Sequence, residues 1–376
     1  MGKWQYREEG KRVSKLILAE KETEELIQAR DFIKELLDLR KSEKLEKTYI
    51  EGTRKAIDYN DCNKVFVDYK LDGTATGRLS CTAYNAEKSM GVSFHTLPRE
   101  TENNVRSFFV APDGYSFLTV DYAAMELRVL SHIAKEQTMQ HAFKTGKDLH
   151  TYTACLLFNK KDEDVTKEER QIAKTVSFLI VYGGGAFNLS ETMAISLVKA
   201  ERVIDNYKTV YPGIFRFMDF INAYIKRNGY AYTIFGRRRN LPDVYSGDFK
   251  IVNRALRQGL NFTIQSSSSD ILLCSLIGIH NRFNDLSMKS KIISTVHDSI
   301  EIISPHEEIK EACEIVYDEM VNYPFIKENF DLVFDVPFGI ETLVGTSFGD
   351  GVEVEYEDGQ VTNLDDVKAY ANSSSY

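Results

Sequence analysis

Two aspartates, far apart in the chain, most constrain what this sequence can fold into. Asp121 lies in the string LTVDYAAMELR, and Asp298 lies in STVHDSIEI. β-branched and aromatic residues precede Asp121 and strong helix formers follow it, which predicts a strand that ends at Asp121 and a helix that begins at Ala123. Two apolar runs around a polar centre predict a β-hairpin with His297 and Asp298 at its tip. Both aspartates can therefore meet at one edge of a sheet.

A pair of carboxylates suits metal-assisted phosphoryl transfer on nucleotides. Two divalent ions about 3.5–4 Å apart can stabilise the attacking and the leaving oxygen of an in-line displacement. Mg²⁺ prefers carboxylates, backbone carbonyls, water and phosphate oxygens. We therefore predict that Asp121, Asp298 and the backbone carbonyl of Tyr122 hold two Mg²⁺ ions, for which Mn²⁺ can substitute. An aspartate between a strand and a helix is also a common N-cap, so the Asp121 string alone leaves both interpretations open.

A basic and aromatic helix is predicted between the two aspartate strings, in ERQIAKTVSFLIVYGGG. Arg170, Lys174, Phe178 and Tyr182 follow one another at steps of four, so they lie along one slowly turning helix face. Cations suit phosphates, and aromatic rings suit a sugar and a base. The glycines after Tyr182 then end the helix. The alternative is an amphipathic helix with a solvated basic side, which does not explain why cations and aromatic rings share a face.

In this order the three strings resemble motifs A, B and C of the family A DNA polymerases, the group that includes bacterial DNA polymerase I and many phage replicases. Arg170, Lys174, Phe178, Tyr182 and Gly183 match the Arg-x3-Lys-x3-Phe-x3-Tyr-Gly pattern of the family's fingers helix. The resemblance implies that Arg170 and Lys174 bind the incoming triphosphate. It also implies that Phe178 packs on the sugar and that Tyr182 lies under the nascent base pair.

Further positions match functional residues of the family one by one. Glu126 resembles the steric gate that excludes ribonucleotides, and His150 resembles the histidine that contacts the triphosphate. Arg128 resembles an arginine that supports the palm. The resemblance also implies contacts with primer–template DNA from a separate set of residues, namely Arg78 in TGRLS, the helical series Arg257, Asn261 and Gln265, and His297.

Three segments depart from the family pattern or allow two interpretations. SFHTLP stands after a longer gap than the family's Leu-Gln-Asn-Ile-Pro string, which puts primer–template contacts from that loop in doubt. Ser299 stands where the third motif has a glutamate, which puts a third carboxylate in doubt and leaves the two aspartates intact. The run Arg237–Arg239 matches a Gly-Arg-Arg-Arg hairpin of the family, or forms a solvated basic turn.

The resemblance covers roughly residues 34 to 350. It implies an α+β right-hand polymerase fold with an antiparallel-sheet palm, helical fingers and a truncated thumb. We interpret the acidic C-terminal tail beyond the match as a flexible or partner-binding extension. The expected domains are residual thumb helices in 1–60, the first part of the palm in 61–132, the fingers in 133–248, the second part of the palm in 249–350 and the acidic tail in 351–376.

The sequence thus predicts a DNA-directed DNA polymerase that adds dNTPs to the 3′ end of a primer. No 3′–5′ exonuclease is expected, because such a domain needs on the order of 100–150 residues and only about 60 precede the palm region. A separate subunit with a thumb, an exonuclease or a processivity function is an expected partner. One alternative is a single-subunit RNA polymerase, against which Glu126 argues. Another is a non-catalytic nucleic-acid-binding subunit, against which the two aspartates argue.

Composition and charge indicate the cellular environment that suits such a chain. The net charge of −9 at first argues against DNA binding, but binding depends on local basic clusters, which occur near 170–174, 237–239 and 254–257. No run of 18 apolar residues and no secretory signal is present, so we expect no contact with a membrane. The five scattered cysteines form no CxxC pair. These features fit the reducing cytoplasm of a bacterial or phage-infected cell.

Overall fold

The computed structural model describes residues 24–60, 62–83, 91–98 and 104–373. The chain forms two compact units. The smaller combines Met1–Tyr69 with Cys81–Pro98, and the larger combines Lys70–Ser80 with Arg99–Tyr376. Every candidate catalytic, nucleotide-binding, metal-binding and DNA-binding residue named above lies in the larger unit.

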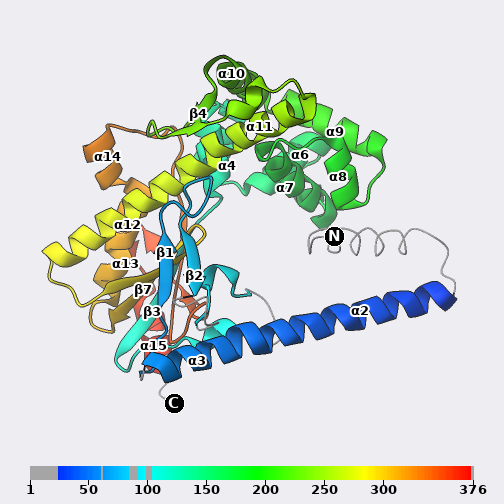
Figure 1. Ribbon diagram of the computed structural model, residues 1–376. Helices are drawn as coiled ribbons and strands as arrows, with labels where there is room; N and C mark the ends of the chain where they lie inside the picture. The colour runs from blue at the N-terminus through cyan, green and yellow to red at the C-terminus, as the bar shows by residue number, and fades with distance from the viewer. Residues whose placement is uncertain (1–23, 61, 84–90, 99–103, 374–376) are drawn as a thin grey trace. The chain divides into compact units, whose positions relative to one another are not determined.

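The smaller unit contains a long helical segment, drawn in blue in Figure 1. Its buried Tyr49 donates a hydrogen bond from the hydroxyl to the backbone oxygen of Thr96 at 2.5 Å. Gly52 approaches the loop at Gly91 so closely that a Cβ atom would lie 2.7 Å from the Gly91 oxygen. The helical elements of this unit are α2 (Glu24–Lys44), the π-helical turn η1 (Leu45–Ile50), α3 (Glu51–Asn60) and η3 (Phe94–Thr96). The paired strands β1 (Val67–Lys70) and β2 (Ser80–Ala83) also belong to it, except for Lys70 and Ser80, which are assigned to the larger unit.

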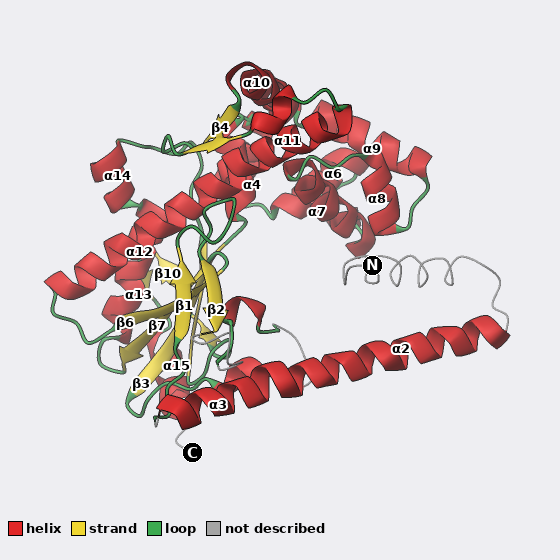
Figure 2. Cartoon of the chain, viewed as in Figure 1, coloured by secondary structure: helices red, strands yellow, loops and turns green. Residues whose placement is uncertain are grey.

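The larger unit is organised around a five-stranded antiparallel sheet in the order β6-β7-β3-β8-β9. The central strand carries Leu118 and Val120, both 0% exposed, toward the core. Figure 2 shows the strands in yellow among red helices. The strands are β3 (Tyr115–Tyr122), β6 (Lys291–Val296), β7 (Ser299–Pro305), β8 (Ile340–Gly345) and β9 (Val352–Glu353).

The local structure at both aspartates agrees closely with the sequence. β3 ends at Tyr122, one residue beyond Asp121. Val296 pairs with Ser299, which leaves His297 and Asp298 as the two-residue tip of the predicted hairpin. His297 has a φ of 61°, in the left-handed region that such tight turns require. The helix α4 (Met125–Ile133) begins later than expected, because Ala124 has a φ of 52° and turns the chain sharply after the strand.

Helices then form the part of the larger unit drawn in green in Figure 1. Thr166 begins α7 (Lys167–Val181) with a capping box to Glu169, and Gly183, with a φ of 69°, follows its end. The other elements of this part are α5 (Gln137–Lys144), α6 (Leu149–Phe158), η5 (Asp162–Asp164), α8 (Ala186–Met193), α9 (Leu197–Val210), α10 (Pro212–Asn228), the hairpin of β4 (Tyr230–Tyr232) and β5 (Arg238–Asn240), and η6 (Pro242–Tyr245). The short helix η4 (Val105–Phe108) precedes β3.

One continuous helical stretch runs over Phe249–Asp285. Within the described ranges it alone is long and apolar enough to cross a membrane, but 78% of its most apolar window is buried inside the protein, which is typical of a core helix. Its parts are α11 (Phe249–Asn261), the π-helical turn η7 (Phe262–Ser266) and α12 (Ser267–Asp285). The elements α13 (Ile309–Tyr317), η8 (Asp318–Asn322) and α14 (Pro324–Phe330) follow the hairpin.

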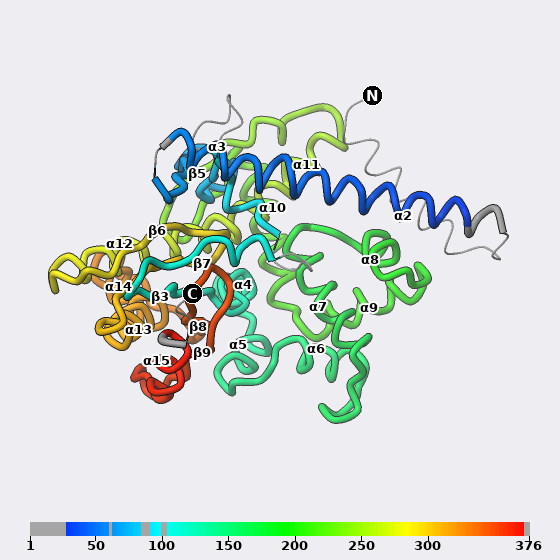
Figure 3. The backbone as a smooth tube through the Cα atoms, turned by 90° about the horizontal axis from the view of Figure 1, so that it is seen from below, coloured from blue at the N-terminus to red at the C-terminus, as the bar shows by residue number. Residues whose placement is uncertain are grey.

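The C-terminal segment is folded, so its interpretation as a flexible extension was wrong, while the partner-binding alternative stays a prediction. β9 pairs with β8 at the edge of the central sheet, and α15 (Leu364–Ser373) lies beside both strands (Figure 3). Val354 and Val367 are 5% and 0% exposed. The short strands β10 (Tyr356–Glu357) and β11 (Gln360–Val361) form a hairpin between them. Because acidic residues dominate the composition of this segment, the sequence alone did not identify Val354 and Val367 as core positions.

Candidate active site

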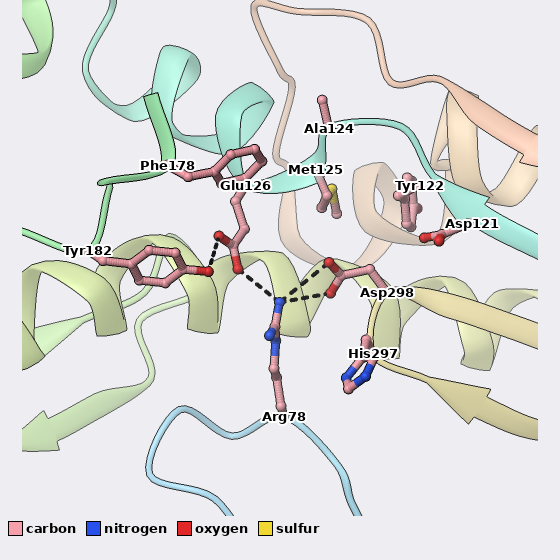
Figure 4. A pocket seen from close by; sticks show the side chains of 10 residues that line it. All are labelled: Arg78, Asp121, Tyr122, Ala124, Met125, Glu126, Phe178, Tyr182, His297 and Asp298. Atoms are coloured by element: carbon pink, nitrogen blue, oxygen red, sulfur yellow. Dashed lines mark hydrogen bonds and ion pairs between the residues drawn. The ribbon is translucent and has the colours of Figure 1, made fainter. Parts of the chain in front are cut away.

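A cavity of about 500 Å³ in the larger unit gathers both aspartates with side chains from five segments of the chain (Figure 4). β3 and the turn after it contribute residues, as do α4, the end of α7, the β6–β7 hairpin and the loop that carries Arg78. The lining residues are Arg78, Asp121, Tyr122, Ala124, Met125, Glu126, Phe178, Tyr182, His297 and Asp298.

The pairing of β3 with β7 brings Asp121 and Asp298 together. Asp121 lies opposite Ser299, the residue after Asp298, and the Tyr122 amide donates to the Asp298 carbonyl at 3.4 Å. The Tyr122 side chain points away into the core, where its hydroxyl is 2.8 Å from that of Ser275. The backbone of Tyr122 therefore stays beside the two carboxylates while its ring anchors the strand end.

Glu126 is 6% exposed and accepts three hydrogen bonds within the site. Arg78 Nη2 donates to it at 2.8 Å, the Tyr182 hydroxyl at 3.1 Å and Gln265 Nε2 at 3.3 Å. Burial, together with the negative charge of Glu126, raises the pKa of Tyr182 to about 12, so its hydroxyl remains a donor at neutral pH. The gate candidate is thus held in one position by donors from three separate segments.

Arg78 also connects the gate candidate to the metal-ligand candidates. Its Nη2 lies 3.0 Å from Oδ1 and 3.4 Å from Oδ2 of Asp298, as the dashed lines in Figure 4 show. A cationic side chain therefore faces one of the two aspartates directly.

The helix α7 presents the expected face. Ile172, Val176 and Ile180 are buried, whereas Arg170 and Lys174 are exposed. Phe178 and Tyr182 reach the cavity described above, while neither cation lines it. The cations and the aromatic rings thus share one face of the helix. The cations lie nearer its N-terminal end, and the aromatic rings lie nearer its C-terminal end.

Arg170 is engaged by Asp148, a residue that the sequence analysis did not single out. Arg170 Nε and Nη2 donate to the two carboxylate oxygens of Asp148 at 2.9 and 3.1 Å. Asp148 also caps α6 by accepting from the Thr151 amide at 2.9 Å. Burial raises the pKa of Asp148, but the hydrogen bonds from Arg170 and Thr151 outweigh it and hold the pKa well below its usual range. A search for N-caps before His150 would have found it.

His150 lies beside Phe178 and close enough to Arg170 and Lys174 to be affected by their charges. Its ring centroid is 6.0 Å from that of Phe178. Burial lowers the pKa of His150 to about 4, and the charges of Arg170 and Lys174 act in the same direction against that of Asp148. The imidazole is therefore neutral at physiological pH and can donate one hydrogen bond.

The predicted DNA-contacting series is divided by the π-helical turn. Arg257 lies exposed on α11 and packs against Gly183, where a Cβ atom would come within 2.8 Å of Arg257 Cγ. Asn261 Oδ1 is buried and has no hydrogen-bond partner among the described residues. Gln265, in η7, is buried and bonds to Glu126 instead of facing outward. His297, at the hairpin tip, lines the cavity.

The interpretation of Arg237 as part of a solvated turn was wrong. Its Nε and Nη2 donate to Asp270 Oδ1 at 3.0 and 2.7 Å, and Nη2 also donates to the Thr76 oxygen at 3.3 Å. Gly77 lies against the guanidinium so closely that a Cβ atom would be 2.1 Å from Nη1. Arg237 therefore holds the loop that carries Arg78.

A buried carboxyl behind Asp121 was also missed. Glu301, on β7, is 1% exposed and accepts from the hydroxyls of Thr119 at 2.6 Å and Ser299 at 2.7 Å. Burial raises the pKa of Glu301 to about 7, against the effect of these two hydrogen bonds. Its string had been identified, but only the register of β3 with β7 shows that it faces Thr119.

The donor set fits hard divalent cations. Both aspartates present carboxylate oxygens to one cavity, and Asp298 already attracts the cationic Arg78. Across the residues that the structure describes, no group of three or more histidine, cysteine, aspartate or glutamate side chains forms a complete metal cage. Mg²⁺ sites on nucleotides show this pattern, because water and substrate phosphates complete the shell.

Comparisons with known proteins agree with this geometry. The model of DNA polymerase family A matches residues 3–350. The chain is 34% identical over 299 residues to DNA polymerase I of Geobacillus stearothermophilus, covering 79% of this chain and 33% of that protein. It is 35% identical over 292 residues to DNA polymerase I of Streptococcus pneumoniae, covering 77% of this chain and 32% of that protein. The chain thus spans about a third of the length of these curated relatives.

A solved structure shares the fold. The POL domain of Pol1 from M. smegmatis, in complex with DNA primer-template and dNTP, superposes with a TM-score of 0.77 at 27% identity, covering 86% of this chain and 55% of that one. The expected α+β polymerase fold is therefore confirmed. With the family match over most of its length, the chain belongs to the family A DNA polymerases.

Proposed function

We propose that this chain is a template-directed DNA polymerase that adds dNTPs to the 3′ end of a DNA primer and releases pyrophosphate. The convergence of Asp121, Asp298 and Glu126 on one cavity, in a chain of this family, carries the proposal. The mycobacterial neighbour is in complex with DNA primer-template and dNTP, which supports the same substrates here.

Asp121 and Asp298 would hold two Mg²⁺ ions, with the backbone carbonyl of Tyr122 as a further oxygen ligand. Bound ions of this kind supply stabilisation of the attacking and leaving oxygens. The two aspartates would fix the position of the ions, because Asp121 lies at the end of the central strand β3 and Asp298 lies in the turn of the β6–β7 hairpin that pairs with β3. Mn²⁺ offers the same oxygen preference and is a suitable probe.

The nucleotide would lie along the exposed face of α7. Arg170 and Lys174 supply positive charge for the triphosphate, and neutral His150 supplies a hydrogen-bond donor. Phe178 would pack on the sugar, and Tyr182 under the base pair. Glu126, locked by its three donors, would exclude a 2′ hydroxyl.

DNA would be bound by residues on the remaining sides of the site. We assign Arg78 and His297 to the primer side, because both line the cavity. Arg257 and Asn261 would contact the duplex from α11. Gln265 would act at the inner end of this series, where it also positions Glu126.

We also propose which residue ranges form the palm, the fingers and the thumb. Residues 61–132 and 249–350 would form the palm, 133–248 the fingers and 1–60 a reduced thumb. The family match occupies 3–350, and we assign none of this range to an exonuclease domain. A partner with a thumb, exonuclease or processivity function would bind this chain, in the cytoplasm of a bacterial or phage-infected cell.

The test is primer extension with labelled dNTPs, then with NTPs. Asp121→Asn and Asp298→Asn should each reduce extension about a thousandfold or more, because a charged metal ligand is lost. Asp219→Asn, at an exposed position outside the cavity, is the matched control and should extend normally. Extension within tenfold of wild type in either active-site variant would falsify the assignment.

The same assay separates the alternatives. Preferential use of NTPs would identify an RNA polymerase, and Glu126 argues against that outcome. Binding of primer–template without extension would identify a non-catalytic subunit, and the presence of both aspartates in one cavity argues against that outcome.

A further inference from the structure

The central sheet contains a buried polar group directly behind Asp121. In the register of β3 with β7, Ser299 lies opposite Asp121 and Glu301 lies opposite Thr119. Residues that are opposite each other, or two apart on one strand, share a face of the sheet. Thr119, Asp121, Ser299 and Glu301 therefore form a four-residue patch on one face, which we call the polar patch.

The polar patch is closed by specific hydrogen bonds. The Thr119 hydroxyl donates to Glu301 Oε2 at 2.6 Å, and the Ser299 hydroxyl donates to Oε1 at 2.7 Å. Each carboxylate oxygen thus has its own donor. The Ser299 hydroxyl, which has one proton to share, also lies 3.0 Å from the Val296 oxygen on β6.

A core sheet position gains little stability from such a group. A carboxyl buried to 1% exposure loses its hydration, and apolar side chains of similar volume commonly stabilise a core as well or better. The charges of Asp121 and of the buried Arg106 both act on Glu301. This placement points to a role toward the aspartate site and not to packing alone.

The position of Ser299 makes that role specific. By the resemblance described above, Ser299 stands where the third motif has a glutamate, and its hydroxyl bonds to a carboxylate two residues further along the same strand face. Residues directly opposite across an antiparallel pair have Cβ atoms about 4.5–5.5 Å apart, and diagonal neighbours about 7–8 Å. The carboxyl group of Glu301 is therefore displaced by one residue pair from Asp121 and stays on the same face of the sheet.

We propose that Glu301 replaces the missing third carboxylate, acting through Ser299 and Thr119 to strengthen divalent-cation binding at Asp121 and Asp298. Glu301 is a positioning residue, because it does not line the cavity. The inference rests on the proposed function, since it assumes that the two aspartates bind metal.

The test is direct Mn²⁺ binding to the full chain, measured by electron paramagnetic resonance with a dideoxy-terminated primer–template and the complementary dNTP. Glu301→Gln should weaken the affinity about tenfold, as loss of a partner behind a metal ligand commonly does. The double variant Ser299→Glu/Glu301→Val returns the carboxylate to the family position and should bind within threefold of wild type.

Glu341→Gln is the matched control. Glu341 lies opposite Asp121 on the other neighbouring strand and is exposed, so it tests whether any carboxylate near Asp121 suffices. Its affinity should change less than twofold. An effect from Glu341→Gln with none from Glu301→Gln would overturn the inference.

Asp121→Asn separates this inference from the proposed function. If Asp121→Asn abolishes Mn²⁺ binding while Glu301→Gln binds like wild type, Glu301 has no such role and the metal site stands. If Asp121→Asn binds like wild type, the metal assignment itself is wrong. Should Glu301→Gln fail to fold, the double variant decides, because binding more than tenfold weaker than wild type in that folded protein contradicts the replacement.

Discussion

Arg78 donates a hydrogen bond to Asp298 at 3.0 Å, so a guanidinium faces a carboxylate that we assign to metal binding. The same Nη2 atom bonds to Glu126 at 2.8 Å. Arg237 and Asp270 support the loop that carries Arg78. Arg78 thereby balances the negative charge of Asp298. Any cation that binds Asp298 must compete with the Arg78 guanidinium for that carboxylate.

Arg78→Ala should therefore raise Mn²⁺ affinity in the protein without DNA. The two side chains of this ion pair are 24% and 30% exposed, and a partly exposed pair contributes about 0.2–1 kcal/mol, so we expect binding up to about fivefold tighter. Extension should fall, because the proposed primer contact is lost. Arg78→Lys keeps a positive charge and should stay closer to wild type. Unchanged Mn²⁺ affinity in Arg78→Ala would show that the arginine and the cation do not compete.

Glu126→Ala should relax the choice of sugar. The substitution opens space where three donors now hold a carboxylate, so the ratio of kcat/KM for dNTP over NTP should fall at least tenfold, or about 1.4 kcal/mol. Tyr182→Phe removes one donor and leaves the carboxylate, so its ratio should change much less. Equal ratios in wild type and Glu126→Ala would place the gate elsewhere.

Phe178→Tyr should increase the acceptance of dideoxynucleotides. The ring lines the cavity beside Glu126, and a phenolic hydroxyl there can replace interactions lost with the 3′ hydroxyl. Termination ladders at a fixed dideoxy ratio measure the effect. Phe187→Tyr, on the exposed surface of α8 outside the cavity, should leave the ladder unchanged. Identical ladders from Phe178→Tyr and wild type would show that Phe178 does not contact the sugar.

The sequence predicted those parts of the site that depend on short-range patterns. Steps of four placed Arg170 and Phe178 on one face of α7, and the run of β-branched residues before Asp121 predicted β3, because such periodicities act within one element. The bond from Arg237 to Asp270 and the contact of Thr119 with Glu301 depend on register between remote segments. No local pattern encodes them.

The C-terminal segment was misjudged for a related reason. Its charged residues dominate the composition, and its few valines become core residues only against an existing sheet edge. Val367→Asp should therefore lower the free energy of unfolding by roughly 3 kcal/mol, because it buries an unpaired charge between α15 and the sheet. Val333→Asp, at a position 67% exposed, is the control and should change it little. Thermal denaturation compares them, and equal melting temperatures would show that α15 contributes little to stability.

Glu301→Gln should change how stability depends on pH when EDTA removes divalent ions. The pKa of Glu301 is about 7 in the folded protein and about 4.3 in an unfolded chain. Its folded-state pKa is raised, so its contribution to stability is fully present below about pH 4.3 and is lost as the pH rises through about 7.

At 1.36 kcal/mol per pKa unit, wild type should lose roughly 3–4 kcal/mol between pH 4.3 and pH 8 relative to Glu301→Gln, whose amide does not titrate. Melting temperatures of the two proteins at pH 5 and pH 8 measure this difference, which should favour the variant more at pH 8. Asp219→Asn, which alters an exposed carboxylate, should follow the wild-type profile. Parallel profiles for wild type and Glu301→Gln would mean that Glu301 is already ionised at pH 5 in the folded protein.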